Sequence, residues 1–156
     1  MCGLKRPAFI LLFGLLFFSA ASTFAQYFNF GRNKVQYNDF AWKVLSTEHF
    51  DIHYYNDFDE IASIGAAYAE EAFREYTIEF GQQVYRRIPL IFYNTGIHFR
   101  ETNTTPGFIP EGVGGFFEFL KGRVVLPYTG SLPKFRHVIR HELVHVFMTS
   151  RLINIA

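Results

Sequence analysis

Near the end of this 156-residue chain, His141-Glu142-Leu143-Val144-His145 places two histidines four positions apart. In an α-helix, residues with this spacing project from the same face, so both imidazoles can reach one metal ion. Glu142 follows the first histidine directly and can reach a water molecule bound to that ion. Nitrogen ligands, an open coordination position and a carboxylate base are what a zinc hydrolase site requires. The pattern therefore predicts a helix with one face open to a metal.

The residues on both sides of the motif support this interpretation. Val138 and Ile139 precede it, Val146 and Phe147 follow it, and Arg140 is the one charged neighbour. Apolar flanks of this kind are typical of the buried motif helix of zinc metallopeptidases. The alternative is a core helix whose two histidines are satisfied by ordinary hydrogen bonds.

Residues 1–25 have the composition of a secretory signal peptide. Lys5 and Arg6 form a short positive region, residues 8–18 are an uninterrupted apolar run, and small residues lead to Ala25, which fits cleavage before Gln26. The apolar run is shorter than the roughly 20 residues that a membrane-spanning helix needs. We therefore expect an exported protein, periplasmic, at the cell surface or secreted. An uncleaved segment that anchors the chain in a membrane is the alternative.

The composition of the remaining chain limits its chemistry. Cys2 is the single cysteine, so after cleavage no disulfide and no thiolate ligand is available, and a metal must rely on histidine and carboxylates. Without Lys5 and Arg6, 13 of the 15 basic residues remain against 14 acidic ones, a formal charge of −1. Nothing in this balance favours binding to nucleic acid or to an anionic membrane.

Strand-like and helix-like patterns alternate along the rest of the chain. Apolar and polar residues alternate at 48–55, as in a strand, and a helical spacing follows, with Asp57 and Glu60 as a capping signal. The expected elements are a strand at 48–55, a helix at about 58–80 ended by Gly81, a strand at 88–93, two runs at 116–120 and 123–126 joined by a tight turn at Lys121-Gly122, and the motif helix from its cap Ser131 to about Arg151. This order predicts an α+β domain, a mixed β-sheet packed on a long backing helix and on the motif helix.

Several local expectations follow from the same patterns. The first helix should bury a stripe at helical spacing, namely Ile61, Ile64, Tyr68, Ala72, Tyr76 and Phe80. The segment 26–44 should be an extended lead-in that packs through Phe28, Phe30, Tyr37, Phe40 and Trp42. The region 94–115 is a long loop, of a length that is often functional or mobile, with Phe108 and Ile109 as an apolar patch and His98, Arg100 and Glu111 as polar candidates.

The other histidines do not complete the motif. His49 and His53 have no partner at ligand spacing and are interpreted as surface or hydrogen-bonded residues. His137 precedes His145 by two helical turns, about 12 Å along the axis, which is too far for both to bind one metal.

Taken together, these features resemble the N-terminal part of a zincin catalytic domain. The chain is most similar to the peptidase MA-like domains of exported bacterial proteins, a gluzincin-type group of zinc metallopeptidases often followed by a Tol-type β-propeller. The stretches that carry the likeness are 31–37, 48–52, 110–116, 122–127 and 140–145.

The resemblance implies Zn²⁺ on His141 and His145, with Glu142 as the base. It also implies an edge strand beside the cleft at Arg123, Val124, Val125 and Leu126, which would pair with the backbone of a peptide substrate. A gluzincin takes its third protein ligand, a glutamate, from a helix some twenty or more residues beyond the motif. We therefore expect the chain to Ala156 to be a fragment of a longer protein, and by itself a poor zinc binder and inactive. Met148 and Arg151 exclude the metzincin pattern.

Two functions from different classes are compatible with this sequence. The first is zinc-dependent hydrolysis of peptide bonds by an exported metallopeptidase, with a peptide or protein as substrate. The alternative is a non-catalytic binding or scaffold domain on a zincin frame, attached to a β-propeller. The intact motif favours the enzyme, because a binding module has no need of Glu142 beside the ligands.

Overall fold

The computed structural model of the chain describes residue 34, residues 38–105 and residues 107–154. The expected signal peptide and the lead-in residues Phe28, Phe30 and Tyr37 lie outside these ranges. Within the described ranges, no helix combines the length and the apolar character that crossing a membrane requires.

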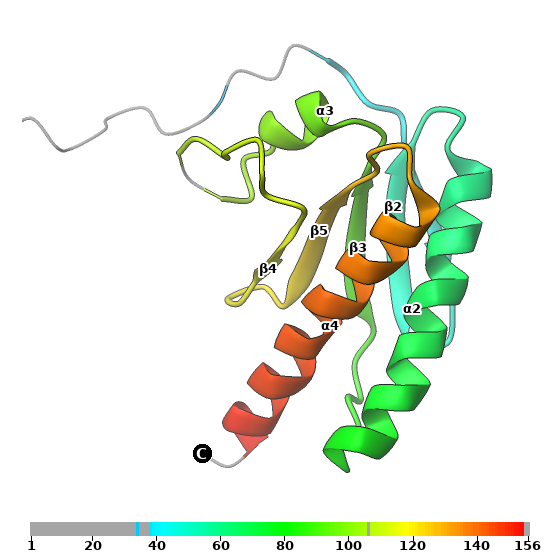
Figure 1. Cartoon of the computed structure of the whole chain (residues 1–156), viewed down its shortest axis with the longest axis vertical. Helices are drawn as coiled ribbons and strands as arrows, with labels where there is room; N and C mark the ends of the chain where they lie inside the picture. Colours follow the sequence, from blue (N-terminus) through cyan, green and yellow to red (C-terminus); the bar gives the residue numbers. More distant parts are fainter. Residues whose placement is uncertain (1–33, 35–37, 106, 155–156) are drawn as a thin grey trace, which may run out of the picture. The chain divides into compact units, whose positions relative to one another are not determined.

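A five-stranded mixed sheet forms the centre of the described fold (Figure 1). The strands are β1 (Trp42–Ser46), β2 (Phe50–Tyr55), β3 (Ile88–Tyr93), β4 (Phe116–Glu118) and β5 (Arg123–Pro127), and their order across the sheet is β1-β2-β3-β5-β4. The central strands β2, β3 and β5 are parallel, whereas β1 and β4 are antiparallel to their neighbours. The expected α+β class and the mixed sheet are confirmed.

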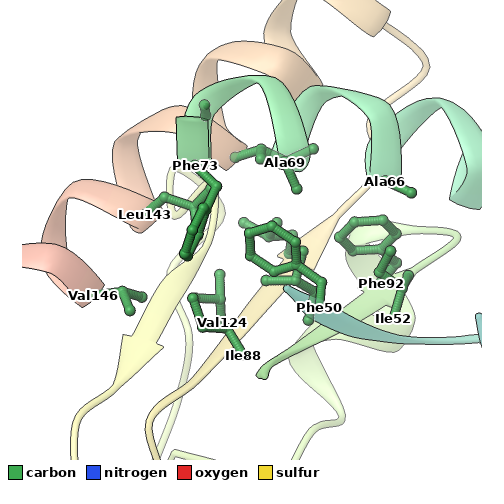
Figure 2. Close-up of a cluster of buried hydrophobic side chains, with 14 of the residues drawn as sticks. Phe50, Ile52, Ala66, Ala69, Phe73, Ile88, Phe92, Val124, Leu143 and Val146 are labelled. Carbon is green, nitrogen blue, oxygen red and sulfur yellow. The ribbon is translucent and has the colours of Figure 1, made fainter. Parts of the chain in front are cut away.

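The long helices α2 (Asp59–Phe80) and α4 (Leu132–Asn154) cover one face of this sheet (Figure 1). The side chains between the layers are large and apolar, and Figure 2 shows Phe50, Ile52 and Phe92 packed beneath α2. In β2 the predicted alternation is confirmed, since Phe50, Ile52 and Tyr54 all belong to this core. The burial of these rings is the main force that holds both helices on the sheet.

The buried face of α2 consists mostly of small residues and confirms the predicted stripe only in part. The buried residues are Ala62, Gly65, Ala66, Ala69, Ala72, Phe73 and Tyr76, so Ala72 and Tyr76 of the stripe are buried as predicted. Ile61, Tyr68 and Phe80 pack against the core but are only partly buried, as is Ile64. A Cβ atom on Gly65 would lie 2.5 Å from Cε2 of Phe92 and 2.9 Å from Cε1 of Phe135. The small residues therefore let the helix backbone approach the aromatic rings closely.

The ends of α2 were predicted in part. Gly81 ends the helix in the left-handed conformation, with φ of 60°, as expected. The predicted cap was wrong, because the N-cap is Phe58 and no side chain caps the helix there. Asp59 instead accepts hydrogen bonds from Lys43 and Tyr54 and so connects the first turn to the sheet.

Gly65→Val is expected to destabilise the fold by about 2–3 kcal/mol, because the added methyl groups would overlap two buried rings that cannot move apart freely. Urea denaturation measures this loss. Ala67→Val is the matched control, since Ala67 is exposed on the same helix, and there the cost should stay within about 1 kcal/mol. Equal losses in the two variants would show that packing against Phe92 and Phe135 does not decide the result.

The opposite face of the sheet is partly covered by the segment between β3 and β4. This segment contains a short helix that was not predicted, α3 (Gly96–Arg100). Its residues Phe99 and Ile109 form a second core with Tyr55, Tyr93 and Val125. The predicted apolar patch is thus divided, because Ile109 is buried whereas Phe108 is 82% exposed.

The hairpin of β4 and β5 is confirmed, but its turn is longer than predicted. Strand β4 ends at Glu118, so four residues, 119–122, connect the strands, and Gly122 has a φ of 61°. At the start of α4, Ser131 acts as the predicted cap, accepting a hydrogen bond from the backbone N–H of Lys134 at 3.4 Å. The motif helix extends to Asn154, three residues beyond the predicted end.

Candidate functional site

The orientation of α4 about its own axis is set by its buried face. Phe135, Ile139, Leu143 and Phe147 follow one another at intervals of four and are 2% exposed or less. They pack into the main core, where Phe147 meets Phe73 of α2 with ring centroids 5.3 Å apart. Because these side chains face the core, the rotation of α4 about its axis is fixed, and so is the direction in which each of its other side chains points.

Two ion pairs hold the side of α4 that lies against α2. Arg136 donates to Glu71 at 2.8 Å, and Arg140, one turn later, donates to Glu75 at 2.5 Å. The hydroxyl of Tyr76 also donates to the backbone carbonyl of Arg140, at 3.2 Å. Exposed ion pairs contribute little energy each, but together with the tyrosine they limit rotation of the helix next to the motif.

The motif histidines lie on the open side of α4. His141 and His145 are exposed, and their ring centroids are 5.1 Å apart with an angle of 80° between the ring planes. An imidazole that binds zinc has its ring centroid about 3.2 Å from the ion. Two centroids 5.1 Å apart would then make an angle of about 105° at the ion, which is close to the tetrahedral angle. The separation of the two ring centroids is therefore compatible with one shared metal ion.

Glu142 lies in a very different environment from its two neighbours. It is 6% exposed and is the one buried carboxylate among the described residues. Burial raises the pKa of Glu142 above its ordinary value, and positive charge on His141 and His145 opposes that rise only in part. Within the described part of the chain, no hydrogen bond reaches its carboxylate.

The side of α4 that carries Glu142 faces the segment leading into β4. Val138, one turn earlier on that side, is so close to Gly115 that a Cβ atom there would lie 3.1 Å from Cγ1 of Val138. The same Cβ would lie 2.5 Å from Cδ2 of Leu126 in β5. Glycine at this position thus allows the segment before β4 to pass close to the motif helix, and this approach shields that side of α4 from solvent.

The predicted edge strand at Arg123, Val124, Val125 and Leu126 is not at the edge of the sheet, so this prediction is wrong. These residues form β5, which pairs with β3 on one side and with β4 on the other, so β5 is an interior strand without a free edge. The side chains of Val124, Val125 and Leu126 are buried, and Arg123 is paired with Glu118. The resemblance implied an edge strand here, whereas the hairpin places β4 outside β5.

The remaining polar candidates do not gather at the motif. His98 shares a hydrogen bond with the hydroxyl of Tyr55 at 2.8 Å, and His49 bonds to Glu70, so both are hydrogen-bonded histidines. Glu111 is exposed on the loop. In the described ranges, no cluster of three or more histidine, cysteine or acidic side chains could hold a metal ion.

Sequence reasoning predicted the strand at 116–120 but missed its position at the edge of the sheet. It also missed the burial of Glu142. Both depend on how the elements pack in three dimensions, for which the local sequence contained no signal.

The roles of these residues must be argued from their own chemistry and geometry. No family model, no curated protein and no solved structure matches this chain.

Proposed function

We propose that this chain carries the zinc-binding and proton-transfer residues of an exported zinc-dependent peptidase. The observation that supports this most directly is the contrast on α4 between a buried carboxylate, Glu142, and two exposed imidazoles, His141 and His145. Burying most of a glutamate side chain costs stability and needs a reason. A general base beside a metal is such a reason, because catalysis uses a raised pKa.

The two imidazoles would hold the metal ion. His141 and His145 have accessible rings on adjacent turns, so each can offer a nitrogen lone pair to an ion on the open side of α4. When bound, zinc supplies a Lewis acid that polarises the scissile carbonyl and increases the acidity of water near neutral pH. Two imidazoles leave further coordination positions for other ligands.

Glu142 would move the proton. Its carboxylate accepts a proton from the attacking water and then delivers it to the leaving amine, as a general base and then a general acid. Its raised pKa makes it a better proton acceptor than an exposed glutamate. The absence of competing hydrogen bonds within the described residues leaves both oxygens free for this work.

An extended peptide could approach along β4. This strand, Phe116–Glu118, forms one edge of the sheet and lies next to α4. Among the described residues, β5 is its one strand partner, so its other backbone groups are free to pair with an added strand. In this proposal β4, and not β5, pairs with the backbone of a peptide substrate.

Chelation is the direct test of the proposal. The natural protein is expected to hydrolyse an unfolded protein substrate, to lose this activity to background level with a zinc chelator, and to regain it when zinc is added back. A serine-protease inhibitor serves as the control and should have no effect. Hydrolysis that resists chelation would contradict the assignment. Tight zinc binding without hydrolysis would instead favour the binding or scaffold function.

A further inference from the structure

A second histidine, far from the motif in the sequence, is held in an unusually fixed position. His49 lies just before β2, and its Nδ1 is 2.7 Å from Oε2 of Glu70 in α2. The other oxygen of Glu70 accepts hydrogen bonds from the backbone N–H of His49 at 3.0 Å and from the hydroxyl of Thr47 at 2.6 Å. Both oxygens of this carboxylate are therefore used to position one imidazole.

The plane of the His49 ring is fixed as well. The ring stacks on Phe73, with centroids 3.8 Å apart and an interplanar angle of 20°. The contact with Glu70 uses Nδ1, so Nε2 is the ring nitrogen that remains for another partner.

His49 also lines a cavity. The cavity has a volume of about 630 Å³, and its lining includes Glu48, His49, Phe73, Arg74, Thr77 and Tyr85. Oε1 of Glu48 lies 3.9 Å from Nε2 of His49. In a tetrahedral site with bonds of about 2.1 Å, a nitrogen and an oxygen ligand are about 3.4 Å apart, so the carboxylate needs to move by only about half an ångström. Glu48 can do so, because its side chain is 83% exposed.

We propose that His49 and Glu48 form a second binding site for a divalent transition metal such as zinc, with Glu70 as the group that orients the imidazole. A carboxylate on the far nitrogen of a ligating histidine is the arrangement that fixes its tautomer and strengthens it as a ligand. A mixed nitrogen and oxygen donor set favours Zn²⁺, Ni²⁺ or Cu²⁺ over Mg²⁺. Water from the open cavity completes the coordination.

The pairing of His49 with Glu70 ties the start of β2 to α2, and that contact uses Nδ1. The pairing leaves Nε2 for Glu48, whose Oε1 lies 3.9 Å away. Arg74 lines the same cavity, and its positive charge weakens the attraction for a cation. The site should therefore bind metal less tightly than a site with three protein ligands.

The test uses the full chain carrying His141→Gln and His145→Gln, so that the motif helix does not contribute. Calorimetric titration with zinc should show one site, and Glu48→Gln or His49→Gln should weaken binding at least tenfold. Glu70→Gln should weaken it by about 10–100-fold, the usual effect of losing such an orienting group. Glu79→Gln, an exposed glutamate on the same helix as Glu70, is the control and should bind like the parent. Titration with Mg²⁺ should show no binding.

Glu48→Gln keeps the proposal open to refutation even if changes at His49 or Glu70 disturb folding, because Glu48 is an exposed side chain. Undiminished zinc affinity in a folded Glu48→Gln variant would overturn the site. So would a parent that binds no zinc at millimolar concentration, or one that binds Mg²⁺ as well as zinc. None of these outcomes tests zinc binding by the motif helix, because His141 and His145 are replaced by glutamine in every variant of this experiment.

Discussion

Replacing Glu142 by glutamine should remove nearly all peptide hydrolysis while zinc remains bound. The amide has the shape of the carboxylate but cannot accept a proton from the attacking water. General base catalysis contributes about 10²–10⁴-fold to the rate, so kcat should fall by that factor. The measurements are cleavage of a fluorogenic peptide by the natural protein and its zinc content. Glu111→Gln, at an exposed glutamate on the loop, should leave both unchanged.

The same substitution should make the metal-free protein more stable at neutral pH. Burial raises the pKa of Glu142 in the folded state, so folding disfavours the ionised form. The resulting cost is absent below the ordinary pKa of a glutamate, grows as pH rises, and is complete above the folded-state pKa. Glutamine escapes this cost, with a gain on the order of 1 kcal/mol, as is common when a functional residue is replaced.

Urea denaturation of the metal-free protein at pH 7.5 and near pH 4 separates this effect from a general change in packing. At pH 7.5 the Glu142→Gln variant should be more stable than the unmutated protein. Near pH 4 this difference in the free energy of unfolding should disappear. Activity at near wild-type level would show that Glu142 is not the base. A loss of activity together with a loss of stability at both pH values would point to disturbed folding instead.

The parts of the fold that were predicted correctly are those where a local pattern reflects a local environment. In β2, Phe50, Ile52 and Tyr54 alternate with more polar residues because one face of the strand meets the helices. Gly81 could be recognised as the end of α2 because few other residues adopt positive φ there. Ser131 could be recognised as a cap for a similar reason, since its hydroxyl satisfies a free N–H of the first turn.

The parts that were missed depend on neighbours that are distant in sequence. The buried face of α2 was misplaced because Ala and Gly carry little hydrophobic signal, yet small residues are what allow close approach to Phe92 and Phe135. β1 was missed because Trp42 and Val44 are largely exposed at the edge of the sheet and show no clean alternation. The edge position of β4 is a property of the whole sheet order.

The candidate site shows the same division. Two histidines four apart on a helix must share a face, so the accessible pair could be predicted from spacing alone. The burial of Glu142 could not, because it depends on how α4 packs in the fold. The fixed position of His49 was equally hidden, since Glu70 is 21 residues away. Spacing within a helix thus predicts which side chains share a face, and tertiary packing decides what surrounds them.

Loss of either motif imidazole should weaken zinc binding at α4 at least tenfold. Removing an orienting group costs about 10–100-fold in metal affinity, and removing a ligand itself should cost no less. The variants are His141→Gln and His145→Gln, prepared with Glu48→Gln so that the cavity beside His49 does not contribute. Competition with a chromophoric chelator measures the affinity. Both histidines are exposed, so stability should change by no more than about 0.5 kcal/mol.

His137→Gln is the matched control for this experiment. His137 is exposed on α4 one turn before His141, so its loss removes an imidazole of the same kind from the same helix. It lies two turns from His145, about 12 Å along the axis, and cannot share an ion with it. Zinc affinity should therefore be unchanged in this variant. If His137→Gln weakened binding as much as His141→Gln does, the ion would be held by surface histidines in general, and the pairing of His141 with His145 would have no special role.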